Sequence, residues 1–183
     1  MFNLNDNLKN KKFLIYGYGK TGYATCNYLK KSNKIFIYDD NKKIKKFFIS
    51  FKKIQLKEFD YIVLSPGIDI NKCKLKRYLK KNKKKIITDL DIFYLKNPNN
   101  LKITITGTNG KSTTAKLLYN ILKDQNKDVI LAGNIGTPIL SKSNIKPNTI
   151  FVIEASSYQI NYSKYYKTDY AFILNISPDH LER

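Results

Sequence analysis

The sequence is short of several residue types, and each shortage excludes a class of protein. Its two cysteines, Cys26 and Cys73, lie far apart and lack the spacing of metal ligands, so neither a zinc site nor a disulfide framework is expected. No apolar run is long enough to span a bilayer, and residues 1–12 lack the apolar core of a signal peptide. We therefore expect a cytoplasmic protein with reduced thiols and no membrane partner.

Arginine is also scarce, although the chain is strongly basic. The 34 lysines and arginines outnumber the 14 acidic residues and give a formal net charge of +20, yet arginine occurs only at Arg77 and Arg183. Arginine is the residue that reads guanine edges and grips phosphates with a planar fork of donors. Lysines scattered through the chain without an aromatic and basic recognition motif favour solvated side chains. We expect no nucleic-acid partner, and a basic nucleic-acid-binding module is the non-enzyme alternative.

The chain does contain a regular alternation of strand-like and helix-like segments, with 42% apolar residues. Short β-rich apolar runs separated by helical patterns are typical of parallel sheets with crossover helices. The predicted fold class is α/β, with a Rossmann-like parallel-sheet domain over residues 1–97 and a truncated P-loop α/β ATPase domain over residues 98–183, joined by a linker at 96–100. The predicted strands cover residues 13–16, 35–38, 61–64, 86–88, 103–106, 129–132, 150–153 and 170–176.

The most informative segment runs from the strand at 103–106 through a glycine-rich turn into a helix. Small residues let successive backbone N–H groups converge on phosphate oxygens, Lys111 can neutralise the terminal phosphates, and the Ser112 hydroxyl can bind Mg²⁺. Gly107 and Gly110 have only two residues between them, fewer than in the usual phosphate loop, so the loop is a variant. The predicted ATP-binding residues are Gly107, Thr108, Asn109, Gly110, Lys111, Ser112 and Thr113.

A second glycine motif follows the first predicted strand. Gly17, Gly19 and Gly22 match the dinucleotide-binding pattern, and Asp39 follows the next strand, about 20 residues further on. These residues predict a site for a diphosphate-bearing nucleotide, with NAD as one possibility and a purely structural turn as another. Ser65 ends the third strand beside the same crevice, where an ordinary turn is the alternative.

Two polar residues near the end of the chain are candidates for metal binding. Glu154 ends a buried strand next to the phosphate loop, where an acid that holds Mg²⁺ belongs, although a capping or ion-pair role is the alternative. His180 is the only histidine, and such a residue is often structural. The last residues follow a strand and stop without a terminal element, so we expect the chain to be a fragment that ends inside a site.

Taken together, these motifs resemble the Mur ligase family. The shortened phosphate loop is itself a trait of that family, and the motifs occur in the family's order across nearly the whole chain. The elements at 65–68 and 156–159 point to the branch of the family that adds D-glutamate. The motifs that carry the resemblance lie at 17–22, 65–68, 106–113, 133–138, 154–159 and 175–183.

The resemblance implies an ATP- and Mg²⁺-dependent ligase that joins D-glutamate to UDP-N-acetylmuramoyl-L-alanine through an acyl phosphate, and that is a monomer at full length. It implies catalytic roles for Lys111, Glu154 and His180, with Ser112, Glu154 and His180 at metal sites. It also implies that Thr21, Asp39 and Ser65 contact the UDP-sugar, with Lys20 and Asp40 beside them. The residues implied to line the rest of the substrate side are Asn134, Ser156 and Gln159.

Two other enzyme classes remain as alternatives. Folylpolyglutamate synthase shares the loop type and the amide-forming chemistry, but a UDP-binding glycine loop ahead of the ATPase is not expected there. An NAD-binding Rossmann oxidoreductase would explain residues 17–22 and Asp39 but leaves Lys111 and Ser112 without a role. The residues that bind D-glutamate and adenine are expected beyond Arg183, so we expect this chain alone to be inactive.

Overall fold

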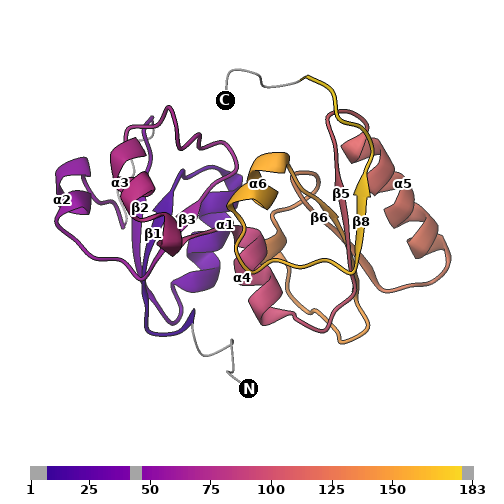
Figure 1. Ribbon diagram of the computed structural model, residues 1–183. Helices are drawn as coiled ribbons and strands as arrows, with labels where there is room; N and C mark the ends of the chain where they lie inside the picture. Colours follow the sequence, from indigo (N-terminus) through magenta and orange to yellow (C-terminus); the bar gives the residue numbers. More distant parts are fainter. Residues whose placement is uncertain (1–7, 42–46, 179–183) are drawn as a thin grey trace.

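The computed structural model describes residues 8–41 and 47–178, which form two α/β units side by side (Figure 1). In the first unit four parallel strands lie in the order β2-β1-β3-β4. The run at 86–88 loses its last residue to a helix, because the Thr88 hydroxyl accepts a hydrogen bond from the Asp91 N–H and so caps α4. The elements are β1 (Lys12–Tyr16), α1 (Lys20–Leu29), β2 (Lys34–Tyr38), α2 (Phe51–Gln55), β3 (Tyr61–Leu64), α3 (Lys76–Lys81), the 3₁₀ helix η2 (Lys83–Lys85), β4 (Ile86–Ile87) and α4 (Asp89–Lys96).

The second unit is also a four-stranded parallel sheet, but its order is β6-β7-β5-β8, so its first strand, β5, lies between its third and fourth strands. The predicted strand at 170–176 ends at Ile173, because the chain then turns over the loop that follows β5. All eight predicted strands are present, and the predicted α/β class with parallel sheets is confirmed. The elements are β5 (Lys102–Thr106), α5 (Lys111–Asp124), β6 (Val129–Gly133), the 3₁₀ helix η3 (Ile139–Ser141), β7 (Ile150–Glu154), α6 (Ser157–Tyr162) and β8 (Tyr170–Ile173).

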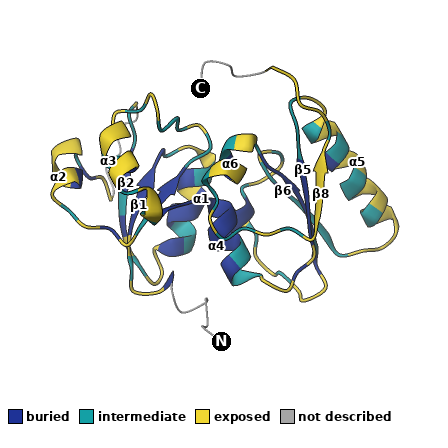
Figure 2. Ribbon diagram, viewed as in Figure 1, coloured by how far each residue is buried: buried dark blue, intermediate teal, exposed yellow. Residues whose placement is uncertain are grey.

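Helix α4 lies between the two sheets and is buried along most of its length (Figures 1 and 2). Phe93 of α4 packs edge-on against Phe151 of β7, with ring centroids 4.6 Å apart. One hydrophobic cluster therefore runs from β1 and β2 through α4 to β6 and β7. The boundary at residues 97 and 98 stays a prediction, since α4 packs on both units.

Asp91 ties α4 to the segment that follows α6. Its Oδ1 accepts hydrogen bonds from three consecutive backbone N–H groups, those of Lys164, Tyr165 and Tyr166, at 2.9, 2.6 and 2.9 Å. Its Oδ2 accepts the Thr88 N–H at 2.8 Å. Because the Asp91 side chain is fully buried, these four hydrogen bonds supply the contacts that its carboxylate oxygens would otherwise make with water.

The predicted linker is held in place by two side chains. Asn100 donates to the carbonyls of Lys146 and Thr149 at 2.8 and 3.0 Å. Lys102 is only 1% exposed, and its ammonium donates to the carbonyls of Pro98, at 3.1 Å, and Asn100. Burial lowers the pKa of Lys102. The connection between the units is therefore packed against β5.

Asp89, the first residue of α4, lies two residues before Asp91 and is buried, and the side chain of Gln159 is its side-chain partner among the residues described. Gln159 of α6 donates to its Oδ1 at 3.3 Å. Burial raises the pKa of Asp89 from 3.8 to about 6, more than the bond from Gln159 lowers it. The folded protein therefore holds a proton that the unfolded chain releases between these two pH values, and the free energy of unfolding falls as pH rises through that window.

We expect Asp89→Asn to remove this pH dependence. Above pH 6 the variant should be more stable than the parent by up to about 3 kcal/mol, because the buried charge is gone. Below about pH 4 the difference should vanish, because Asp89 is then protonated in both states. Urea unfolding at several pH values measures the difference, with the exposed Asp124→Asn as control. A difference between parent and variant that does not change with pH would contradict the assignment.

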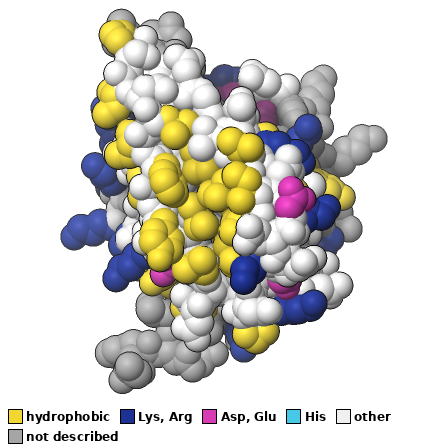
Figure 3. Space-filling model, turned by 90° about the vertical axis from the view of Figure 1, so that its right-hand side faces the viewer, with side chains coloured by type: hydrophobic (Ala, Val, Ile, Leu, Met, Phe, Trp, Pro, Cys, Tyr) yellow, Lys and Arg dark blue, Asp and Glu magenta, His cyan; other side chains and the backbone are white. Residues whose placement is uncertain are grey.

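The outer face of the second unit is apolar (Figure 3). Strand β8 is the edge of its sheet, and all four of its residues are exposed. Leu117 and Ile121 of α5 and Phe172 and Ile173 of β8 are about half exposed or more. Contiguous apolar surface of this kind is typical of a face that another part of a protein covers. None of the helices in the described ranges is long and apolar enough to cross a membrane.

Candidate functional site

The predicted phosphate loop joins β5 to the 14-residue helix α5. Gly110 is the N-cap of α5 with φ +81°, and Gly107 has φ +138°, both in the region that favours glycine. A Cβ on Gly107 would also lie 3.1 Å from the Asn175 carbonyl oxygen. The loop therefore presents its backbone at the positive end of a helix dipole, as a phosphate site requires.

Lys111 lies at the first position of α5 and is half-buried. Its Nζ donates to the carbonyl oxygens of Gly107 and Thr108 at 2.7 and 2.6 Å. The Lys111 ammonium therefore lies over the loop and is hydrogen-bonded to two carbonyl oxygens of the loop itself. A phosphate that binds here would exchange those two bonds for stronger, charge-assisted ones.

Ser112 and Glu154 are brought together as the sequence predicts. Glu154 ends β7, which pairs with β5 so that Glu154 lies opposite Ile105. The Ser112 hydroxyl donates to Glu154 Oε2 at 2.8 Å, and Glu154 is 5% exposed. The hydroxyl and the carboxylate both offer oxygen ligands, which Mg²⁺ prefers. Two protein ligands can suffice, because Mg²⁺ keeps much of its water shell. The pair therefore fits Mg²⁺, whereas no group of three or more His, Cys, Asp or Glu side chains that could hold a metal occurs among the residues described.

Asn175 braces the phosphate loop, a role that the sequence analysis missed. Its Oδ1 accepts the Asn109 N–H at 2.9 Å, and its Nδ2 donates to the Asn109 carbonyl at 3.0 Å. Its backbone carbonyl accepts the Thr108 N–H at 3.1 Å. The available signal was an asparagine inside the run predicted as the last strand, which marks the point where that strand ends.

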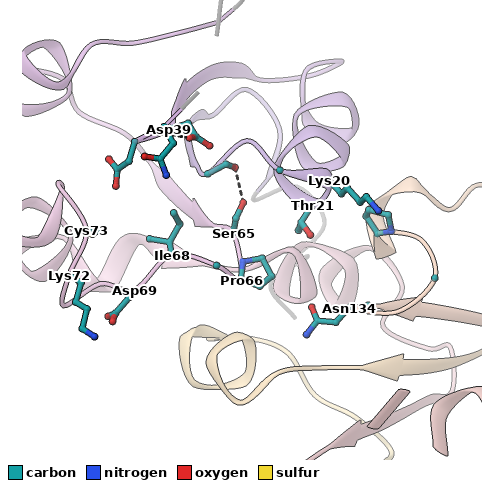
Figure 4. Close-up of a pocket in the computed structure, with 18 residues that line it drawn as sticks. Lys20, Thr21, Asp39, Ser65, Pro66, Ile68, Asp69, Lys72, Cys73 and Asn134 are labelled. Atoms are coloured by element: carbon teal, nitrogen blue, oxygen red, sulfur yellow. Dashed lines mark hydrogen bonds between the residues drawn. The ribbon is translucent and has the colours of Figure 1, made fainter. Parts of the chain in front are cut away.

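A second candidate site is a cleft of about 840 Å³ lined by residues of both units (Figure 4). In the first sheet β1 lies between β2 and β3, so the loops after β1 and β3 diverge at a switch point, where open α/β sheets bind ligands. The structure brings together four predicted substrate-side residues around this cleft. They are Thr21, Asp39 and Ser65 of the first unit and Asn134 of the second.

Asp39 and Ser65 also hold the glycine loop in shape. Asp39 Oδ2 accepts the Tyr18 N–H at 2.6 Å, and the Ser65 hydroxyl donates to the Gly17 carbonyl at 2.7 Å. Gly22 is in contact with the same turn, since a Cβ there would lie 2.0 Å from the Gly17 carbonyl oxygen. The loop is therefore a rigid turn as well as a candidate phosphate site.

Several cleft residues had no sequence signal. Asp69, Lys72 and Cys73 line the wall formed by the loop after β3, where no motif marks them. Burial raises the pKa of the Cys73 thiol. Lys72 and Lys20 are the two basic side chains that line the cleft, on opposite walls (Figure 4), and three carboxylates, those of Asp39, Asp40 and Asp69, line it with them.

Ser156 and Gln159 are placed elsewhere. They form a capping box at the start of α6: the Ser156 hydroxyl accepts the Gln159 N–H, and Gln159 Oε1 accepts the Ser156 N–H, both at 3.2 Å. Neither residue lines the cleft, and Gln159 is buried against Asp89. Their substrate-side role stays a prediction. His180, with the metal role expected for it, lies outside the described residues.

Glu154 connects the cleft to the phosphate loop. Gly133 and Asn134 line the cleft, and the Asn134 N–H donates to the Glu154 carbonyl at 3.0 Å. Gly133 has φ +108°, and a Cβ on it would lie 2.1 Å from that same carbonyl oxygen. The backbone of Gly133 and Asn134, which line the cleft, is thus in direct contact with Glu154, the residue that accepts the Ser112 hydrogen bond.

Comparison with known proteins identifies relatives of the whole chain. Residues 105–183 match the family model described as the Mur ligase middle domain. Over 184 aligned residues the chain is 42% identical to proteins named UDP-N-acetylmuramoylalanine–D-glutamate ligase from Francisella tularensis subsp. tularensis (strain WY96-3418) and subsp. novicida (strain U112). The match covers all of this chain and 42% of each relative. The chain therefore spans about two fifths of the length of those relatives.

A solved structure has a similar fold. It is the crystal structure of UDP-N-acetylmuramate:L-alanyl-gamma-D-glutamyl-meso-diaminopimelate ligase from Neisseria meningitides, with a TM-score of 0.53 and 15% identity. The match covers 93% of this chain and 62% of that one, and at this identity it bears on the fold alone. The family model over residues 105–183 and the 42% identity along the whole chain agree with what the phosphate loop and the cleft beside it indicate: this chain is similar to Mur ligases over its full length.

Proposed function

We propose that the protein containing this chain is an ATP-dependent ligase that joins D-glutamate to UDP-N-acetylmuramoyl-L-alanine. The observation that carries the proposal is the contact of Gly133 and Asn134 with Glu154, which puts the end of the cleft beside the phosphate loop. A substrate in the cleft can then reach a phosphate on the loop. The names of the Francisella relatives supply the substrates of the proposal.

In this proposal the phosphate loop holds the β- and γ-phosphates of ATP. The N–H groups at the start of α5 point at the phosphates, and Lys111 moves from the Gly107 and Thr108 carbonyls to the phosphate oxygens. Ser112 and Glu154 would hold Mg²⁺, which reduces the negative charge of the phosphates when it is bound. Thr113 lies in the same first turn and completes the predicted ATP-binding set.

The cleft would hold the UDP-linked substrate. The glycine loop at the start of α1 admits a diphosphate close to the backbone, and Lys20 and Lys72 lie within reach as counter-charges. Thr21, Asp39 and Asp40 supply a hydroxyl and carboxylates that can bond to sugar or base. Asn134 marks the end nearest Glu154, where the reacting carboxylate would lie.

The proposed reaction has two balanced steps. A substrate carboxylate oxygen attacks the γ-phosphorus of ATP, the bond to the bridging oxygen breaks, and ADP and an acyl phosphate form. The amine of D-glutamate then attacks the acyl carbon, forms the amide, and releases phosphate and a proton. The chain's main task is to bring an anionic nucleophile to an anionic phosphate, and Lys111 lowers their repulsion. Because the reaction consumes ATP, we propose a cytoplasmic protein, and we expect it to act as a monomer.

The oxidoreductase alternative has less support from the fold. In the dinucleotide-binding sheet the second strand lies between the first and the third. Here β1 lies between β2 and β3. An NAD enzyme also leaves Lys111, Ser112 and Glu154 without a task. The loop after β3, which contributes Ser65 to the cleft, favours a UDP-sugar site over the plan expected for folylpolyglutamate synthase.

Calorimetry on the full-length protein tests the proposal. We expect UDP-N-acetylmuramoyl-L-alanine and ATP to bind and NAD not to bind. Thr21→Val removes one hydroxyl from the cleft. It should weaken the binding of the UDP-substrate by about tenfold, which corresponds to one good hydrogen bond, and leave the affinity for ATP unchanged. Thr113→Val should do the reverse, so each variant is the control of the other. Binding of NAD in competition with the UDP-substrate would overturn the proposal.

A further inference from the structure

The densest run of charge in the chain lies far from the phosphate loop. Residues 74–85 contain eight lysines and arginines and no acid, whereas the other 171 residues contain 26 basic residues. A run in which two residues of three are basic exceeds the background of a lysine-rich chain. This run forms helix α3 and the 3₁₀ helix η2.

Residues 80–85 of this run form one wall of a groove between the two units. The groove has a volume of about 720 Å³, and its other wall is the end of α6 with the residues after it. Three apolar side chains lie in it, Ile70, Ile86 and Tyr162, and no acidic residue lines it. Six lysines surround them: Lys80, Lys81, Lys83, Lys84, Lys85 and Lys164.

These lysines are unneutralised. The side chains of the five lysines between residues 80 and 85 have no hydrogen bond or ion pair with any residue that the structure describes. Lys164 is tied across the groove, since its Nζ donates to the Lys84 carbonyl at 3.1 Å, which adds a sixth positive charge to the group. Like charges this close repel one another, and an anionic occupant would remove that cost.

We propose that this groove binds an acidic segment of a partner protein that carries an apolar side chain as its anchor. The six lysines match a segment rich in Glu or Asp, and the apolar residues between them match one Leu- or Phe-sized side chain. The groove is concave with walls from two units, which suits a chain segment and not a flat bilayer surface. No arginine, the residue that most often contacts bases and phosphates in nucleic-acid complexes, lines the groove. Its apolar side chains cannot hydrogen-bond a phosphate, so the groove fits nucleic acid less well than an acidic peptide.

Fluorescence anisotropy with the full-length protein and a labelled peptide of eight glutamates around one phenylalanine tests the proposal. We expect saturable binding at physiological salt. Lys81→Glu with Lys84→Glu should weaken it at least tenfold, whereas Lys116→Glu with Lys123→Glu on α5, the same change of net charge, should weaken it less than twofold. Replacing the phenylalanine of the peptide by serine should weaken binding to the parent protein but not to Ile70→Ser, since the anchor contacts that residue.

Three results would overturn the proposal. Equal losses from the two double variants would mean that net charge alone attracts the peptide. Equal affinity for the phenylalanine and serine peptides would mean that the apolar floor takes no part. Tighter binding of duplex DNA, or of vesicles with one quarter phosphatidylglycerol, that is lost only in the Lys81 and Lys84 variant would assign the surface to a different class of partner.

Discussion

Lys111→Ala should lower kcat/KM for ATP in the proposed full-length ligase by about 100- to 1,000-fold, the usual effect of removing one charge-stabilising donor from a reacting centre. Lys111 is the only ammonium that the structure places on the loop carbonyls of Gly107 and Thr108, within the residues described. In the proposed reaction its charge is needed most when the substrate carboxylate and the γ-phosphate approach each other. Phosphate release in the presence of D-glutamate measures the effect.

Lys116→Ala is the matched control for this prediction. Lys116 lies on the same helix and is exposed, and its Nζ lies over the ring of Tyr119, 4.9 Å from the centroid. Lys116→Ala removes the same charge as Lys111→Ala, but about one helical turn further from the loop. We expect its kcat/KM to stay within twofold of the parent. A Lys111→Ala enzyme that keeps more than a tenth of the parent activity would refute the role given to Lys111.

Asp91→Ala should lower the free energy of unfolding by about 3–5 kcal/mol, as when one partner of a buried charged contact is removed. The three N–H groups at residues 164–166 and the Thr88 N–H would lose their acceptor at once. In a chain of this size the midpoint of thermal unfolding should fall by about 10 °C. Urea and thermal unfolding followed by circular dichroism measure both quantities.

Asp124→Ala provides the comparison, because Asp124 is an exposed carboxylate at the end of α5. It should change the free energy of unfolding by less than about 0.5 kcal/mol. If Asp91→Ala is as mild as Asp124→Ala, the contacts between α4 and the segment after α6 contribute little, and the two units are held together by Phe93 and its apolar neighbours alone.

The parts of the fold that follow from local pattern were predictable. Eight apolar runs became eight strands, and those that are buried, such as β3 and β7, need a continuous apolar sequence because both of their faces are covered. Glu154 was placed beside Ser112 because neighbouring parallel strands end at the same edge of the sheet. Ser65 was placed beside Gly17 for the same reason, and the structure gives 2.7 Å between its hydroxyl and the Gly17 carbonyl.

The parts that depend on distant partners were not predictable. Lys102 begins a strand and reads as an exposed end, yet it is buried because the carbonyls of Pro98 and Asn100 accept its ammonium protons. Asp91 reads as a first-turn acid of a helix, and nothing local indicates its three N–H donors some 75 residues away. Ser156 and Gln159 have the spacing of a capping box, which is a local signal. The sequence analysis assigned both residues to the substrate side instead, because they match a motif of the family.

The brace of Asn175 on the phosphate loop also has a consequence for folding. The loop at 107–110 is contiguous in sequence, but its support lies 66 residues downstream. Contacts of such long range form late, because the chain between them must be ordered first. During synthesis the loop would leave the ribosome long before Asn175 does, so nascent chains are expected to acquire nucleotide affinity only after β8 has joined the sheet.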